Sequence, residues 1–136
     1  MNNKAIGVFD SGIGGLTVYR AIKEKLPDEK IIYLGDTARL PYGTKSAETI
    51  IRFSEDNAGF LLNQKVKIIV IACNSASATA YDTVRKIVPA SIPVINVIDP
   101  VVDYIVKQKK RKQMSSNCSC WVLCFLCKFG YHNTYT

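Results

Sequence analysis

The sequence predicts an α/β domain in which helices cover both faces of a parallel sheet. Short apolar runs alternate with stretches of helical periodicity from Ala5 to Lys109. The run Val66 to Ala72 (VKIIVIA) is almost continuously apolar and β-branched, which is typical of a strand buried on both faces. Turn-forming residues, as in DSGIGG, separate the runs. Alternating units of this size favour a parallel sheet joined by right-handed crossovers, as in flavodoxin-like folds.

The strands are expected where the apolar runs are short and end in turn residues. They span Ala5 to Phe9, Ile31 to Leu34, Val66 to Ala72 and Pro93 to Ile98. In an open parallel sheet, ligands bind beyond the carboxyl ends of the strands. This rule selects the segments that follow the strands, which we expect to meet in one site: Asp10 to Gly15, Asp36 to Thr44, Cys73 to Ser75, and Asp99 with Pro100.

The helices are expected between these strands. They span Leu16 to Leu26, Ser46 to Asn63, Ser75 to Ile87, and Val101 to about Lys109. Pro27 closes the first, and Thr44 lies near the cap of the second. The second has the clearest apolar face, made of Ala47, Ile50, Ile51, Ser54, Ala58, Leu61 and Leu62.

The segment DSGIGG follows the first strand and opens a helix. Glycines there allow a ligand to approach the backbone, and N–H groups at a helix start attract anions. The alternative is a plain tight turn with Asp10 or Ser11 as the helix cap. The segment is neither G-x-G-x-x-G nor a Walker P-loop, so dinucleotide binding and P-loop NTPase activity are disfavoured.

Cys73 follows the most apolar strand and begins a helix, where the positive end of the helix dipole favours a thiolate. The alternative is a small buried apolar residue, a common fate of cysteine. We favour a functional thiol because the rim of the sheet is where reactive groups lie. Asn74 or Ser75 is the expected cap of the helix.

The net charge of +7 is unevenly distributed. No acidic residue follows Asp103, and the six basic residues after it leave 12 basic against 11 acidic residues in the body. Nucleic-acid binding is therefore not expected, because it needs a basic folded face. The sequence shows no signal peptide and no membrane-length apolar run, so we expect a cytoplasmic protein with Cys73 as a free thiol.

The character of the chain changes near Lys110. We expect residues 1–110 to form an incomplete α/β domain and residues 111–136 to be an unrelated Cys-rich tail that does not fold with it. A frameshift in the lysine run from Lys107 to Lys112 is our hypothesis for the change. Zinc binding by the tail is a disfavoured alternative, because the segment Trp121 to Leu126 is mostly apolar and has no Gly or Pro to turn the chain. Its candidate ligands are Cys118, Cys120, Cys124, Cys127 and His132.

Three ordered segments, GVFDSGIGGLTV, YLGDTARLPYG and ACNSASA, resemble glutamate racemases of the aspartate/glutamate racemase superfamily. The resemblance covers about Ala5 to Lys109. It implies cofactor-independent interconversion of L- and D-glutamate, with the D isomer feeding peptidoglycan synthesis. It also implies two facing α/β domains, each carrying one catalytic cysteine. Inversion needs an acid and a base on opposite faces of a planar carbanion.

On this resemblance Cys73 is the first catalytic thiol, and Asp10 is an acidic residue that assists it. Substrate binding, largely through backbone groups, falls to Asp10, Ser11, Tyr42, Gly43, Asn74 and Ser75. No cofactor and no metal are implied, and glutamate is the expected partner. A second domain with its own cysteine does not follow here, so we expect this truncated chain to be inactive.

Other functions stay open beside the racemase. One is a non-catalytic domain that binds glutamate or another carboxylate, and another is a domain that binds phosphate at DSGIGG. A homodimer in which two copies of Cys73 face one substrate is also left open.

Overall fold

Parallel strands form a four-stranded sheet in the order β2-β1-β3-β4. A computed structural model describes residues 3–111. The strands are β1 (Ile6–Asp10), β2 (Ile31–Gly35), β3 (Ile68–Ile71) and β4 (Val94–Asn96). The predicted parallel sheet is confirmed, with β3 and β4 shorter than the apolar runs that predicted them.

In this order β1 is an interior strand. The direction in which successive strands are added to the sheet reverses between β1 and β3. Phe9 pairs with Leu34 on one side and with Ile71 on the other. The Ala72 N–H donates to the Phe9 carbonyl at 2.8 Å, which keeps the two chains together where the strands end. The segments after β1 and β3 therefore begin side by side, at the kind of crevice where open α/β sheets bind ligands.

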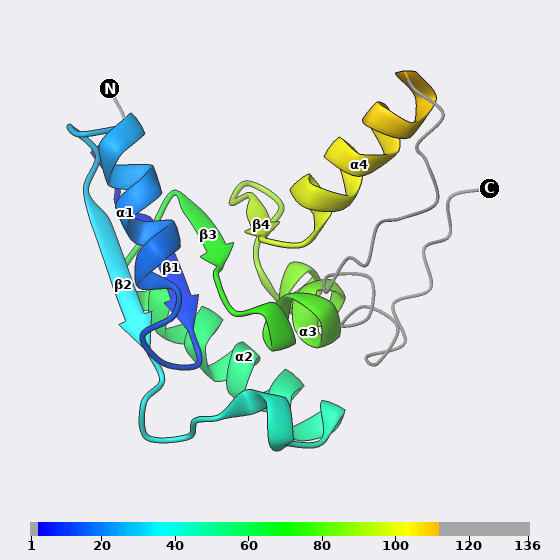
Figure 1. Cartoon of the computed structure of the whole chain (residues 1–136). Helices are drawn as coiled ribbons and strands as arrows, with labels where there is room; N and C mark the ends of the chain where they lie inside the picture. The colour runs from blue at the N-terminus through cyan, green and yellow to red at the C-terminus, as the bar shows by residue number, and fades with distance from the viewer. Residues whose placement is uncertain (1–2, 112–136) are drawn as a thin grey trace.

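The helices lie on both faces of the sheet, as predicted (Figure 1). Helix α1 covers one face, α2 and α3 cover the other, and α4 leads away from the end of β4. Their bounds are α1 (Leu16–Lys25), α2 (Ala47–Asn63), α3 (Asn74–Ile87) and α4 (Asp99–Arg111), and a short 3₁₀ turn, η1 (Tyr42–Thr44), precedes α2.

The apolar residues of the strands divide between two buried clusters. Phe9, Ile69 and Ile71 face α2 and α3, where they pack with the larger cluster, which includes Ile50, Leu61, Ala76, Ala80 and Val84. The opposite face of the sheet packs against Val18 and Ile22 of α1 through a smaller cluster that includes Ile6, Val8, Val70 and Ala72. Because both faces are covered, β1 and β3 are apolar at almost every position.

Two helix caps differ from the sequence-based expectation. Ser46, not Thr44, caps α2, and its Oγ accepts from the Thr49 N–H at 3.3 Å. Cys73 occupies the N-cap of α3, and Asn74 and Ser75 are its first helical residues. Strand β3 ends at Ile71, so the chain turns into the helix earlier than the apolar run suggested.

The buried face of α2 differs at two positions from the apolar face that the sequence predicts. Ala47 is exposed although it lies on the apolar stripe, because it is at the start of the helix. Asn57 is buried although it is polar, and its side chain is hydrogen-bonded. The one sequence feature that indicates this hydrogen bond is the position of Asn57, a polar residue, within the apolar stripe of the helix.

The predicted tail, its zinc alternative and its failure to fold with the domain all lie outside the described residues. Within residues 3–111, no helix is long and apolar enough to cross a membrane. The same residues contain no cluster of three or more His, Cys, Asp or Glu side chains that could hold a metal ion.

Candidate active site

A cavity of about 650 Å³ lies over the carboxyl ends of β1 and β3. Three of the four predicted segments line it, together with α1 and one residue after β4. The lining residues are Asp10 to Gly14, Thr17, Val18, Leu40, Pro41, Ala72 to Ser75, and Val97. The sequence rule therefore located the cavity correctly, and it brought Asp10, Ser11, Cys73, Asn74 and Ser75 together.

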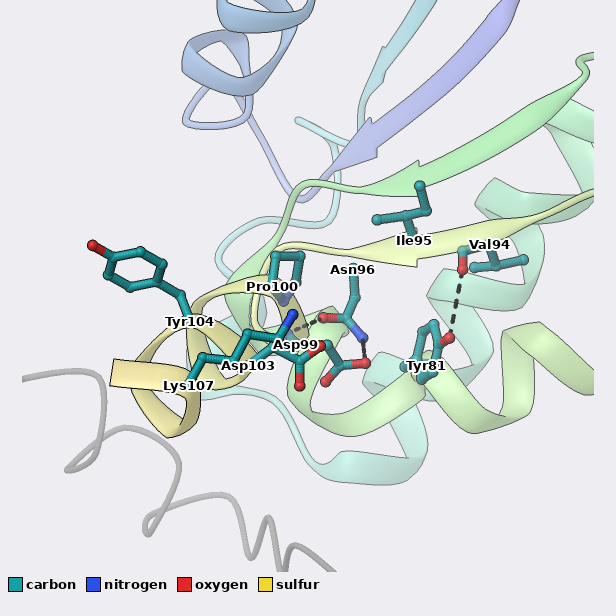
Figure 2. A pocket seen from close by; sticks show the side chains of 9 residues that line it. All are labelled: Tyr81, Val94, Ile95, Asn96, Asp99, Pro100, Asp103, Tyr104 and Lys107. Atoms are coloured by element: carbon teal, nitrogen blue, oxygen red, sulfur yellow. Dashed lines mark hydrogen bonds between the residues drawn. The ribbon is translucent and has the colours of Figure 1, made fainter. Parts of the chain in front are cut away.

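The fourth predicted segment does not join this cavity. Asp99 and Pro100 line a separate hollow of about 460 Å³ between β4, α3 and α4 (Figure 2). Asn96 explains the difference, because its Oδ1 accepts from the Ile98 and Asp99 N–H groups, each at 2.8 Å. Its Nδ2 also donates to Asp99 Oδ2 at 2.7 Å. Val97 still lines the Cys73 cavity, and the chain then turns into α4 at Asp99, which lines the other hollow.

Cys73 lies at the junction between β3 and α3, with 5% of its surface exposed. Its Sγ donates to Ser11 Oγ at 3.4 Å, so the thiol contacts the segment that follows β1. Cys73 belongs to the larger buried cluster and also lines the cavity. It is therefore both packed and open to a ligand in that cavity.

The start of α3 offers backbone donors to the same cavity. The first intrahelical bond runs from the Ser77 N–H to the Cys73 carbonyl at 2.8 Å. The N–H groups of Asn74 and Ser75 come before this first bond in the helix, and the Cys73 side chain makes no capping bond to them. Such N–H groups, at the positive end of the helix dipole, suit a carboxylate or phosphate oxygen.

Asp10 is buried under the glycine-rich segment that follows it. Its Oδ2 accepts from the Gly12 N–H at 3.0 Å and from the Gly15 N–H at 3.1 Å. A Cβ at Gly15 would stand 2.8 Å from the Cβ atoms of Asp10 and Ala72, so glycine is needed for this close turn. Gly15 is the N-cap of α1, and neither Asp10 nor Ser11 is. Asp10 nonetheless holds the turn together.

Tyr33 was missed by the sequence analysis. Its hydroxyl donates to the Gly12 carbonyl at 2.9 Å and lies 3.5 Å from Asp10 Oδ2. Burial, followed by the negative charge of Asp10, raises the pKa of Tyr33 to about 12. A tyrosine in a strand is ordinary, so nothing in the local pattern marked this residue.

Tyr42 and Gly43 lie behind the cavity wall. The Tyr42 ring is buried in the core, and its hydroxyl donates to Asp36 Oδ2 and accepts from Asn57 Nδ2, the latter at 2.9 Å. Burial and the bond to Asp36 raise the pKa of Tyr42. A Cβ at Gly43 would lie 3.7 Å from Ser75 Oγ, so this residue adjoins the cavity. Substrate binding through the backbone of Tyr42 and Gly43 stays a prediction.

Arg39 ties the segment after β2 to α2. Its Nε contacts Asp36 Oδ2 at 2.7 Å, and its Nη1 contacts Asp56 Oδ2 at 2.7 Å. The guanidinium also lies 4.3 Å from the centre of the Phe53 ring. These contacts fix the segment that carries Leu40 and Pro41 into the cavity wall.

The fold and this site define an α/β domain with a thiol and a carboxylate at the point where the strand order reverses. Residues 6–114 match the family model described as Asp/Glu/Hydantoin racemase. The chain belongs to this family.

Individual relatives agree. The chain is 55% identical over 97 residues to a glutamate racemase of Geobacter metallireducens, a match that covers 71% of this chain and 35% of that protein. A glutamate racemase of Sulfurihydrogenibium is 54% identical over 110 residues, with 80% and 42% covered. The structure of Francisella tularensis glutamate racemase in complex with D-glutamate superposes with a TM-score of 0.74 and 53% identity, covering 77% of this chain and 40% of that one. The resemblance seen in the sequence is confirmed, and the chain spans less than half the length of these relatives.

Proposed function

We propose that this chain supplies one half-site of a cofactor-independent glutamate racemase, with Cys73 as the thiol that exchanges a proton with the substrate Cα. The observation that carries the proposal is the placement of Cys73 in the cavity that Asp10 also lines, with the Cys73 Sγ 3.4 Å from Ser11 Oγ. A relative of the same fold is described with D-glutamate bound, which supports an amino acid as the ligand.

In this proposal each group has a role. The Cys73 thiolate removes the Cα proton from one face of glutamate, and Asp10 assists that transfer. The N–H groups of Asn74 and Ser75 bind the α-carboxylate and stabilise the charge that develops next to it. Ser11 and the backbone of Tyr42 and Gly43 hold the remaining polar groups of the substrate. No cofactor or metal takes part in these steps.

Inversion also needs a proton donor on the opposite face. We assign this role to a second thiol. It would lie in the part of a racemase that this chain does not match. By the same reasoning, residues 1–110 form the first of two facing domains, and residues 111–136 are a separate tail. The product D-glutamate would serve peptidoglycan synthesis in the cytoplasm.

A chimera tests this proposal directly. Residues 5–109 of this chain replace the matching segment of the Geobacter metallireducens glutamate racemase. The chimera should convert L-glutamate to D-glutamate, as followed by circular dichroism of the substrate. Changing Cys73 to Ala in the chimera should lower the rate in both directions by a factor of about 10³ or more, because one of the two proton-transfer groups is lost.

Two outcomes would contradict the proposal. A folded chimera that racemises aspartate but not glutamate would show the substrate to be wrong, and an active Cys73→Ala chimera would make Cys73 a packing residue. The alternative function, a non-catalytic anion-binding domain, rests on the backbone N–H groups at the start of α3, to which the Cys73 side chain makes no capping bond. Titrating the chain itself with glutamate and with phosphate separates carboxylate binding from phosphate binding.

A further inference from the structure

Both backbone polar groups of Gly12 are hydrogen-bonded to side chains. Its N–H donates to Asp10 Oδ2 at 3.0 Å, and its carbonyl accepts from the Tyr33 hydroxyl at 2.9 Å. The end of β2 also approaches this carbonyl closely, since a Cβ added at Gly35 would lie 2.4 Å from the oxygen. Tyr33 therefore adds a side-chain hydrogen bond from β2 to the turn that holds Asp10.

We infer that Tyr33 is a positioning residue: by holding the Gly12 carbonyl, it keeps the Gly12 and Gly15 N–H groups on Asp10 and so sets the charge that Cys73 meets. The relevance of this role to catalysis rests on the proposed function, in which Asp10 and Cys73 act together. The positioning itself does not, because it concerns contacts within the free protein.

The electrostatics agree with this geometry. After burial, the charges of Asp10 and Cys73 both contribute to the raised pKa of Tyr33, about 12, so the three groups share one environment. The phenol consequently stays protonated, and able to donate, throughout the pH range in which a thiol titrates. Among the described residues, these interactions link two titratable groups to the surroundings of the thiol: Tyr33, and Asp10, whose Oδ2 lies 3.5 Å from the Tyr33 hydroxyl.

The test is Tyr33→Phe in the full chain, which keeps the ring and removes the donor. Site-resolved alkylation of Cys73 by iodoacetamide is followed across pH by mass spectrometry of its peptide, which avoids the other cysteines. Without Tyr33 the turn loosens, and Asp10 presents more of its negative charge to the thiol. The rate of Cys73 alkylation at pH 7 should then fall about threefold, because more negative charge near the thiol disfavours the reactive thiolate. Amide exchange at Gly12 and Gly15 should quicken about tenfold.

Tyr19→Phe is the matched control. Tyr19 lies edge-on to Tyr33 with ring centroids 6.3 Å apart, and no hydrogen bond joins its hydroxyl to Asp10 or Gly12 among the described residues. This variant should leave both measurements unchanged. Equal shifts in the two variants would mean that ring packing is responsible and would overturn the inference, as would an unshifted Tyr33→Phe.

A double substitution tests the route through Asp10. In an Asp10→Asn background the negative charge is absent, so Tyr33→Phe should cause no further shift in the alkylation profile. A full additive shift would show that Tyr33 acts independently of Asp10. If Tyr33→Phe unfolds, 3-fluorotyrosine at position 33, a stronger donor, should move the profile to lower pH, and no movement would overturn the inference. None of these measurements needs glutamate, so they stand apart from a failure of the racemase proposal.

Discussion

Two glycines decide how closely the segment after β1 can approach the sheet. Gly15 leaves no room for a Cβ against Asp10 and Ala72, and Gly35 leaves none against the Gly12 carbonyl. Glycine is therefore needed at both positions because other segments of the same chain pack closely against them. The short distances allow the turn to fold over Asp10 and to bring Ser11 to Cys73.

We predict that Gly35→Ala displaces this turn. The added methyl would lie 2.4 Å from the Gly12 carbonyl oxygen, well inside contact distance, so the backbone must shift. The free energy of unfolding should fall by about 1–3 kcal/mol. Urea denaturation measures the loss, and faster amide exchange at Gly12 locates it.

Gly59→Ala is the control for that prediction. A Cβ at Gly59 meets no atom within 4 Å, and the residue lies inside α2. Alanine there should stabilise the protein by about 0.5–1 kcal/mol, because it favours the helix and restricts the unfolded chain. Equal losses of stability in the two variants would show that close packing at Gly35 is not the cause.

At the scale of elements, the segment between β2 and α2 is fixed by buried polar contacts. Asp36 accepts hydrogen bonds from Tyr42 and Arg39, and Asn57 of α2 donates to the Tyr42 hydroxyl. Every member has a partner, as buried polar groups require. The contacts hold Leu40 and Pro41 at one wall of the cavity and Gly43 beside Ser75, so α2 helps to shape a site that it does not line.

The two perturbed tyrosines, Tyr33 of β2 and Tyr42 of η1, predict a loss of stability in alkali. Their pKa values are raised above the ordinary value of 10.0, so the folded protein holds protons that the unfolded chain releases. Their contribution is fully present below pH 10 and is lost as the pH rises from 10 toward 12, where Tyr33 itself ionises. Urea unfolding at successive pH values measures the decline. A Tyr33→Phe chain should decline less steeply, and an identical slope would contradict this assignment.

Asn96 is predicted to stabilise the start of α4 without affecting the cavity at Cys73. Asn96→Ala removes two acceptor contacts to backbone N–H groups and a bond to Asp99, and should cost about 1–2 kcal/mol. Amide exchange should quicken in α4, while alkylation of Cys73 is unchanged. Asn63→Ala, at the exposed end of α2, serves as the control and should be nearly neutral. A changed Cys73 rate in Asn96→Ala would show that the two hollows are coupled.

At the scale of the whole molecule, the described residues place one thiol, Cys73, in the cavity. We predict that a polypeptide of these 136 residues alone exchanges the glutamate Cα proton weakly and does not invert the centre. A carbanion formed at Cys73 is reprotonated from the same face. Loss of one of two proton-transfer groups costs a factor of about 10² to 10⁴, and an open site adds to that loss.

Deuterium incorporation into L- and D-glutamate, together with circular dichroism, measures exchange and inversion separately. The active chimera provides the reference rate. Inversion by the 136-residue chain near that rate would contradict the prediction. It would indicate a homodimer in which a second copy of Cys73 faces the substrate, and a rate that rises with the square of the protein concentration would identify it.

The sequence alone predicted the order of strands and helices along the chain, the parallel sheet, and the positions of Asp10 and Cys73 in segments that follow strands. These features follow from local periodicity, turn residues and the general rule for ligand sites in parallel sheets. The family motifs added candidate roles for Ser11, Asn74 and Ser75, which line the cavity as expected.

Tertiary structure alone decided the contacts that span distant positions. Cys73 meets Ser11 across 62 residues, and Tyr33 meets Gly12 across 21, because strand register brings them together. Asp99 lies outside the predicted site because the Asn96 side chain binds the Ile98 and Asp99 N–H groups and turns the chain into α4 at Asp99. Sequence periodicity reports which face of an element is apolar, whereas register and the direction of each turn depend on packing between elements, which no local pattern contains.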